Sequence, residues 1–172
     1  MKNMKLETAS KLVNNLINKD YIVDGKTFNI SKIGWFFKGF NKSVRRLGLC
    51  TWSIEGKYIS LSRKMTELRG EKEVRQTILH EIAHAIDFEI RGKSCHDIFW
   101  KNISRSIGYK GERTVKITNN IKLAIYKWVG ICKEHGLLCG WTRKPNNDKI
   151  CCKCEKPILI VPVTDVRVKK LN

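Results

Sequence analysis

The stretch EKEVRQTILHEIAHAIDFEIR, residues 71–91, decides the fold of this 172-residue chain. An apolar residue recurs every four positions within it, at Val74, Ile78, Ile82, Ile86 and Ile90. That period draws an apolar stripe along one side of a helix. Gly70 precedes the stretch and Gly92 follows it, and glycine is a typical residue at the ends of helices. We therefore expect one long helix over residues 71–91.

The motif His80-Glu81-Ile82-Ala83-His84 lies in the middle of this helix. Its two histidines are one helical turn apart, about 6 Å along the axis, so both imidazoles project to one side. Two such imidazoles can reach one zinc ion at about 2.0–2.1 Å each. Glu81 lies beside the first ligand and can take a proton from the water that the metal activates. The five residues can match by chance, but their small and apolar neighbours place them near a core, which favours the H-E-x-x-H motif of zinc peptidases.

A catalytic zinc needs a third protein ligand and one open position. His96 is the other histidine near the motif, and we expect it to be that ligand. Ser94 is a suitable N-cap for a second helix, which would place His96 in the first turn of that helix. Asp87 and Glu89 are rival ligands, and Asp87 can instead orient a ligand histidine by accepting its N–H. A metzincin site is excluded, because its third histidine would fall at Ile90.

The segments around the motif helix predict further regular structure. Residues 5–18 predict an amphipathic helix, because their apolar side chains share one face. Residues 33–62 predict strands, with Glu55-Gly56-Lys57 as a hairpin turn. Arg45 and Arg46 lie near these strands, where they can contact phosphates or form a charged turn with no such role. Residues 109–125 are polar and basic, and we interpret them as a connector.

The composition predicts a folded protein with an affinity for polyanions. Hydrophobic residues make up 42% of the chain, which is enough for a core. The net charge is +18: residues 1–100 contain 18 Lys and Arg against 11 Asp and Glu, and residues 101–172 contain 16 against 5. Such an excess of positive charge favours binding to nucleic acid, although a basic surface can also serve solubility alone. No apolar run reaches the about 18–20 residues that span a bilayer, and the N-terminus lacks the apolar core of a signal peptide, so we expect a soluble intracellular protein.

The cysteines predict a second metal site. There are seven, an odd number, and without a secretory signal clustered cysteines hold a metal more often than they form disulfides. Two knuckles with two-residue gaps stand out: Cys132 with His135, and Cys151 with Cys154. This is the spacing of a zinc ribbon with one histidine among four ligands, which is a closed structural site. Cys139 and Cys152 are alternative ligands, and buried cysteines without a metal are the alternative to the site itself.

Trp141, Arg143 and Lys144 lie between the two knuckles. An aromatic ring beside cations can stack on a base and hold a phosphate. Trp141 can equally cover the small core of the ribbon. We retain these three residues, together with Arg45 and Arg46, as predicted nucleic-acid contacts.

At this point the residues resemble the SprT-like zinc metalloproteases, the family that includes the DNA–protein crosslink protease Spartan. The resemblance covers nearly the whole chain, with its stretches in the family's order. Those stretches are residues 37–50 with Asn41, Ser43, Arg46, Gly48 and Cys50 in place, the strand Ile59-Ser60-Leu61-Ser62, residues 77–85, the segment Gly92…His96…Phe99-Trp100, and the C-terminal ribbon. The chain departs from the family at His135, where many relatives have cysteine.

The resemblance implies an α+β, zincin-like metalloprotease domain at residues 1–115 and a basic zinc-ribbon segment at residues 116–172. In the first, a small, mainly antiparallel sheet packs against an N-terminal helix and the zinc helices. Zinc is the implied cofactor, with one catalytic ion and one structural ion. The implied ligands of the catalytic ion are His80, His84 and His96, and Glu81 is the implied catalytic base.

We therefore expect a zinc-dependent endopeptidase that acts on proteins bound or crosslinked to DNA. Its expected partners are DNA-bound protein substrates and DNA, either single-stranded or with exposed ends or junctions, and no membrane. One rival function is a general zinc protease whose charge has no nucleic-acid role. Another is a non-catalytic DNA-binding or transcription-associated zinc protein with a vestigial H-E-x-x-H site.

Overall fold

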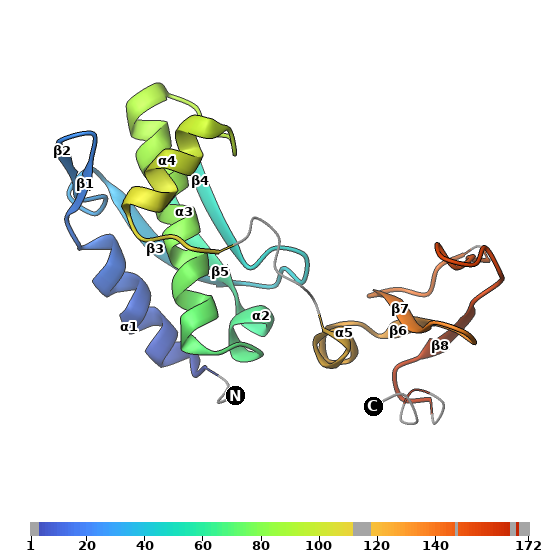
Figure 1. Ribbon diagram of the computed structural model, residues 1–172. Helices are drawn as coiled ribbons and strands as arrows, with labels where there is room; N and C mark the ends of the chain where they lie inside the picture. Colours follow the sequence, from blue (N-terminus) through green and yellow to red (C-terminus); the bar gives the residue numbers. More distant parts are fainter. Residues whose placement is uncertain (1–3, 112–117, 147, 166–167, 169–172) are drawn as a thin grey trace. The chain divides into compact units, whose positions relative to one another are not determined.

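A computed structural model describes residues 4–111, 118–146, 148–165 and 168 of the chain (Figure 1). Contacts divide the chain into two compact units, residues 1–113 and residues 114–172. Each unit has its own buried apolar cluster. None of the helices in the described part of the chain is both long and apolar enough to cross a membrane.

The described residues of the first unit form a small sheet, a short hairpin and four helices. Its elements are α1 (Leu6–Ile17), β1 (Tyr21–Val23), β2 (Lys26–Phe28), β3 (Trp35–Asn41), β4 (Gly48–Ser53), β5 (Gly56–Ser62), α2 (Arg63–Glu67), α3 (Glu71–Arg91) and α4 (Ile98–Ser106). The helix expected over residues 5–18, the strands expected within 33–62 and the helix expected over 71–91 are all confirmed. The α+β class is confirmed with them.

The three-stranded sheet of this unit is mixed rather than antiparallel, which corrects the expectation. Its strand order is β3-β5-β4, and β5 runs parallel to β3 and antiparallel to β4. The β4–β5 hairpin turns through Ile54 and Glu55, so Gly56 and Lys57 already belong to β5. Because β5 inserts between β3 and β4, residues 42–47 must carry the chain past one strand position. Strand β4 is consequently an edge strand of this sheet.

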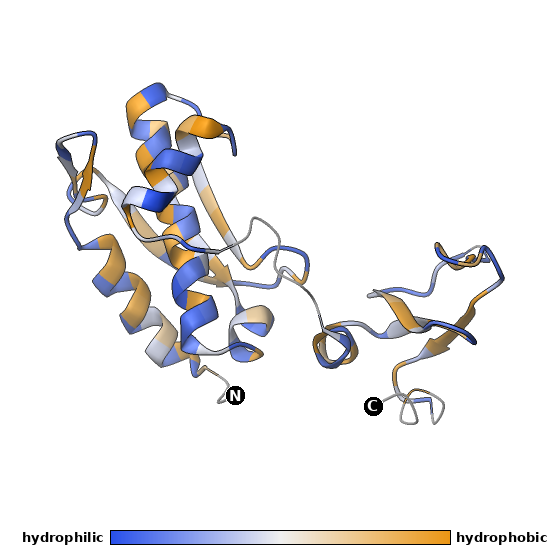
Figure 2. Ribbon diagram, in the orientation of Figure 1, coloured by the Kyte–Doolittle hydropathy of each residue, from blue (hydrophilic) through white to orange (hydrophobic). Residues whose placement is uncertain are grey.

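Helices α1 and α3 lie side by side across the sheet (Figure 1), with α1 against β3 and α3 against β4. Apolar and polar residues alternate along both helices (Figure 2), as the apolar stripes predict. Ile78, Ile82 and Ile86 are fully buried on α3, and Ala83 and Ala85 beside them are fully buried as well. The core therefore surrounds the middle of α3, where the H-E-x-x-H motif lies.

The ends of α3 are fixed by local chemistry. At its start, the Glu73 carboxylate accepts from the Gly70 N–H at 3.3 Å and from Nη1 of Arg69 at 2.8 Å. At its end, Gly92 adopts a left-handed conformation with φ 68° and donates its N–H to the Phe88 carbonyl at 2.7 Å. A glycine in this conformation is the commonest helix stop, because the absence of a Cβ removes the strain.

The expectation that Ser94 caps α4 is wrong. The helix begins at Ile98, and the Asp97 side chain accepts the Trp100 N–H at 3.0 Å. His96 therefore lies in the turn before α4 rather than in its first helical turn. Aspartate and serine are similarly good caps, so the sequence pattern did not distinguish the two positions.

The second unit consists of α5 (Asn119–Ile125) and a three-stranded antiparallel sheet of β6 (Trp128–Cys132), β7 (Gly136–Trp141) and β8 (Leu159–Pro162), in the order β7-β6-β8. Helix α5 corrects part of the connector expected at residues 109–125. Thr118 caps this helix by accepting the Ile121 N–H at 3.4 Å. Residues 112–117 of the expected connector lie outside the described residues. Val129, Leu137, Val161 and Val168 form the buried cluster of this unit, which is far smaller than that of the first.

Candidate metal centres

The structure brings three imidazoles together in the first unit. His80 and His84 project from adjacent turns of α3, and His96 reaches them from the turn before α4. The Nε2 atom of His84 lies 3.3 Å from Nε2 of His80 and 3.0 Å from Nε2 of His96. The Nε2 atoms of His80 and His96 are 3.0 Å apart. Zinc bonds of about 2.0–2.1 Å to three nitrogens at these separations would meet at angles of roughly 95–110°. Three converging Nε2 atoms thus fit one tetrahedral metal ion.

Ser94 orients one of these imidazoles. Nδ1 of His84 lies 2.7 Å from the Ser94 hydroxyl oxygen. When Nδ1–H donates to this oxygen, the lone pair of the ring is on Nε2, which is the atom that faces the other two histidines. Ser94 therefore has a role that the sequence analysis did not assign to it.

Trp100 forms the apolar wall of the three-histidine group. It is buried, and its ring centroid lies 4.8 Å from that of His80, 5.1 Å from that of His84 and 4.6 Å from that of His96. Tyr109 packs against the same group, 5.4 Å from the His80 ring. Burial, with the two neighbouring imidazoles, lowers the pKa of His84 to about 3. The neutral imidazole, which is the form that binds a metal, is therefore favoured.

Glu81 lies on the side of α3 that faces β4. Its side chain is buried, with a relative exposure of 7%. Burial raises its pKa to about 8, against the opposing effects of the Cys50 backbone N–H, which hydrogen-bonds to the carboxylate, and of the Arg46 charge. A Cβ atom built on Gly48 would lie only 2.6 Å from Oε1 of Glu81. A larger residue at position 48 would therefore fit only if the Glu81 side chain moved.

The rival ligands Asp87 and Glu89 have other partners. Asp87 is fully buried and accepts from Nε and Nη2 of Arg91 at 2.6 and 2.8 Å. Glu89 accepts from Nε1 of Trp35 at 2.9 Å and from Nζ of Lys57 at 2.7 Å. Within the described residues, the metal-binding group at this place comprises three histidines only. Three imidazoles without a fourth protein ligand are the donor set of a catalytic zinc with an open position.

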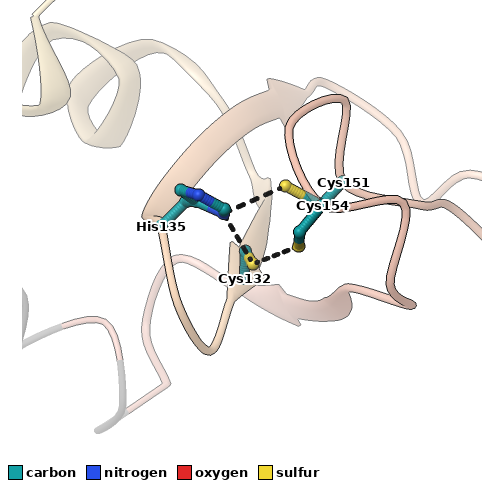
Figure 3. Close-up of side chains that lie close together, drawn as sticks. All are labelled: Cys132, His135, Cys151 and Cys154. Atoms are coloured by element: carbon teal, nitrogen blue, oxygen red, sulfur yellow. Dashed lines mark hydrogen bonds between the residues drawn. The ribbon is translucent and has the colours of Figure 1, made fainter.

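A second group of ligand atoms lies in the second unit (Figure 3). Its members are Cys132, His135, Cys151 and Cys154. Cys132 Sγ lies 3.5 Å from Nδ1 of His135 and 3.7 Å from Sγ of Cys154, and Cys151 Sγ lies 3.5 Å from the same nitrogen. Zinc bonds of about 2.3 Å to sulfur and 2.0–2.1 Å to nitrogen at tetrahedral angles would separate these atoms by roughly 3.8 and 3.6 Å. The four ligand atoms thus fit a closed tetrahedral site, and both groups are compatible with zinc.

The backbone around this second group has the form of a metal knuckle. Cys132 ends β6, His135 lies in the turn before β7, and Cys151 and Cys154 lie in a turn closed by the Glu155 N–H donating to the Cys151 carbonyl at 2.8 Å. The Lys153 N–H also donates to Sγ of Cys151 at 3.4 Å. Such N–H donors stabilise a thiolate, which is the form that binds a metal.

The two other cysteines of the second unit lie outside this group. Cys139 is on β7, where its sulfur would be 2.9 Å from a Cβ on Gly130, and Cys152 is exposed. Neither belongs to a metal-binding group within the described residues. The geometry therefore favours the four ligands predicted from the knuckle spacing over these alternatives.

The predicted nucleic-acid contacts lie in both units. Arg45 and Arg46 are exposed in the segment between β3 and β4, where both backbone N–H groups donate to the Ser43 hydroxyl. Trp141 ends β7 and is half-buried opposite Trp128. The Nζ atom of Lys144 lies 5.3 Å from the centroid of the Trp128 ring, and Arg143 is exposed beside it. Their contact with nucleic acid stays a prediction.

Three features of the first site were not foreseen: the close approach of Gly48 to Glu81, the contact of Ser94 with His84, and the ion pairs of Arg91. Each depends on side chains from separate elements meeting in space. The position of Gly48 within the family-like stretch was the only signal in the sequence, and it did not reveal which side chain the glycine accommodates.

The residues of the three-histidine site lie within a region that is typical of one protein family. Residues 17–122 match the model of the SprT-like family, which is more than half of the chain and includes His80, Glu81, His84 and His96. The chain belongs to the SprT-like family, and this membership suggests a metalloprotease-like function. The matched region ends before Cys132, so the second group lies beyond it. Comparisons with curated proteins and with solved structures gave no significant match.

Proposed function

We propose that this protein is a zinc-dependent endopeptidase that acts on proteins bound or crosslinked to DNA. The observation that carries the proposal is the convergence of three Nε2 atoms, two of them from α3, together with a buried glutamate on that helix. His80, His84 and His96 would hold the catalytic ion, and the second group would hold a structural one. Zinc at the first site would polarise the scissile carbonyl and activate the attacking water.

Glu81 is the base in this proposal. It follows His80 directly on α3, and its carboxylate is not a member of the ligand group. In its ionised form, which the positive charge of a bound zinc ion would favour against burial, the carboxylate would accept a proton from the attacking water and later deliver that proton to the leaving amine. The Cys50 N–H bonds to the carboxylate, Gly48 leaves the space that the carboxylate occupies, and Ser94 contacts the His84 ring. Such fixed geometry is what a proton transfer within hydrogen-bond reach requires.

The charge of the chain supports the DNA part of the proposal. The net charge is +18, and residues 101–172 have the larger excess although they are the shorter part. Lys144, beside the Trp128 ring, and exposed Arg143 combine cations with an aromatic surface. Such surfaces bind single-stranded nucleic acid by phosphate contacts and base stacking. A protein substrate on the same DNA would then be delivered by proximity, which predicts a low sequence preference in cleavage.

The test is cleavage of a histone by the zinc-loaded protein, with and without single-stranded DNA, beside a Glu81→Gln variant. Cleavage that requires both Glu81 and DNA supports the whole proposal. Cleavage that requires Glu81 but is indifferent to DNA leaves a general zinc protease. DNA binding without cleavage, while zinc remains bound, would favour a non-catalytic DNA-binding protein.

A further inference from the structure

We propose that Arg91 is a positioning residue for the three-histidine site, because it fixes the turn that carries Ser94 and His96. The inference rests on the proposed function, since it assumes that the three histidines hold a metal. It assigns a role to the last residue of α3, which is outside the H-E-x-x-H motif and is not a ligand.

Arg91 is anchored on its own helix. Nε and Nη2 of Arg91 donate to the two carboxylate oxygens of Asp87 at 2.6 and 2.8 Å, one turn earlier on α3. Asp87 is fully buried, so its charge requires a partner of opposite charge. The bidentate pair leaves the guanidinium with one orientation, because both groups are planar.

Arg91 also makes contacts across the turn between α3 and α4. Nη1 and Nη2 of Arg91 donate to the two oxygens of Asp97 at 2.7 and 3.2 Å. Asp97 also caps α4 by accepting the Trp100 N–H at 3.0 Å. The guanidinium lies 4.6 Å from the centroid of the Phe99 ring, on the first turn of α4. One side chain therefore joins the end of α3 to the beginning of α4.

The turn that Arg91 closes carries two residues of the three-histidine site. Gly92 ends α3 in a left-handed conformation, and residues 92–97 form no regular structure before α4. These six residues contain Ser94, which contacts Nδ1 of His84, and His96, whose Nε2 lies 3.0 Å from that of His84. A turn closed at both ends by one guanidinium restricts where these two side chains can go. A third ligand from an irregular turn needs such a restraint, because ordering a free backbone opposes metal binding.

Lysine would not replace Arg91 in this role. A single ammonium group cannot bond two carboxylates in bidentate fashion, whereas the guanidinium has five N–H donors in a fixed plane. The distances show four of these N–H···O contacts, two to each aspartate. We therefore expect Arg91→Lys to fall between the wild-type protein and Arg91→Gln.

The experiment measures zinc affinity at the three-histidine site by competition with a chromogenic chelator, with the full chain. The second group of ligands, Cys132, His135, Cys151 and Cys154, is called the Cys/His group below, and zinc binding there serves as an internal reference. Arg91→Gln should weaken zinc binding at the three-histidine site by about 10-fold to 100-fold, which is the usual effect of losing a residue that orients metal ligands. Asp97→Asn, which keeps a capping side chain and the Asp87 pair, should act in the same direction by a smaller factor.

The matched control is Lys57→Gln. It breaks the ion pair to Glu89, which is two residues before Arg91 on α3 and does not touch the turn. Both Arg91→Gln and Lys57→Gln should lower the unfolding temperature, but Lys57→Gln should leave zinc affinity unchanged. Equal losses of affinity in the two variants, or no loss in Arg91→Gln and Asp97→Asn, would overturn the inference. A wild-type protein that binds one zinc only, at the Cys/His group, would instead overturn the proposed metal site.

Discussion

Gly48 on β4 contacts the Glu81 side chain so closely that a methyl group at position 48 would lie 2.6 Å from Oε1 and 2.7 Å from Cγ of Glu81. The backbone conformation of Gly48 is not the reason for the glycine, since its φ lies outside the left-handed range. The requirement is space. Strand β4 and helix α3 therefore approach each other closely at Glu81, the residue that we propose as the catalytic base.

Gly48→Ala should therefore displace the Glu81 carboxylate and lower the rate of proteolysis by about 100-fold, the usual effect of a catalytic group misplaced by about 1 Å. Zinc content should be unchanged, because the histidines are not involved. Initial rates at equal zinc content measure the effect. Gly70→Ala is the control, since a Cβ at that position meets nothing within 4 Å. Equal rates in Gly48→Ala and the wild-type protein would contradict the role of this contact.

Zinc content should be two ions per chain, one for each group of ligands. His80→Ala or His84→Ala should reduce it to one, because two imidazoles alone hold zinc weakly. Elemental analysis after gel filtration measures the ratio, and unfolding temperatures verify that the variants remain folded. A ratio of one in the wild-type protein would remove one of the two sites.

Removal of the metal from the Cys/His group should unfold the second unit and spare the first. The described residues of the second unit have only four buried members in their apolar cluster, so metal binding would supply much of the folding free energy. Hydrogen exchange after treatment with a chelator should become fast in β6, β7 and β8 and remain slow in the buried middle of α3. Cys151→Ser should give the same pattern without chelator. Persistent protection of β6 in the metal-free protein would show that the unit folds without metal.

Ser94→Ala should weaken zinc binding at the three-histidine site by about 10-fold, because the His84 ring loses the acceptor that selects its tautomer. Ser94→Thr, which keeps the hydroxyl, should bind more tightly than Ser94→Ala. Ser106→Ala is the control, since its hydroxyl also bonds within the first unit, to the Ile103 carbonyl, at the end of α4. Chelator competition gives the three affinities. An unchanged affinity in Ser94→Ala would show that the contact does not orient the ligand.

DNA binding should weaken steeply as salt rises, because phosphate contacts release counterions. The double variant Arg143→Gln/Lys144→Gln should reduce the slope of log affinity against log salt by about 1.4, from two contacts at about 0.7 each on a single strand. Fluorescence anisotropy with a single-stranded oligonucleotide measures both slopes. The double variant Lys11→Gln/Lys19→Gln is the control, since it removes the same amount of positive charge from the N-terminal part of the chain. An equal change of slope in the two double variants would indicate a diffuse charge effect rather than contacts at residues 143 and 144.

The parts of the site that follow from local sequence could be predicted. Helix α3 has the expected bounds, because the period of its apolar residues and the glycine that ends it belong to one continuous segment. His80 and His84 share a face because of the helical repeat, and the knuckle spacing brought Cys132, His135, Cys151 and Cys154 into one group. Within α3 and within each knuckle, the geometry depends on residues that are close along the chain.

The parts that depend on tertiary packing could not be predicted. The parallel pairing of β3 with β5 depends on the path of residues 42–47 rather than on strand pattern. Ser94 and Asp97 are similar caps by chemistry, and the contacts with His84 and Arg91 decide their different roles. The capped helix α5 has only seven residues, which is too short for a periodic signal within a basic segment.

The central claim is that the three-histidine site with Glu81 hydrolyses peptide bonds in DNA-bound protein. The most direct measurement is mass spectrometry of a histone on single-stranded DNA after incubation in ¹⁸O-labelled water with the wild-type protein or Glu81→Gln, at equal zinc content. We expect fragments with ¹⁸O in their new carboxyl ends for the wild-type protein and intact histone for Glu81→Gln. Intact histone with both zinc-loaded proteins, or equal fragmentation by both, would contradict it.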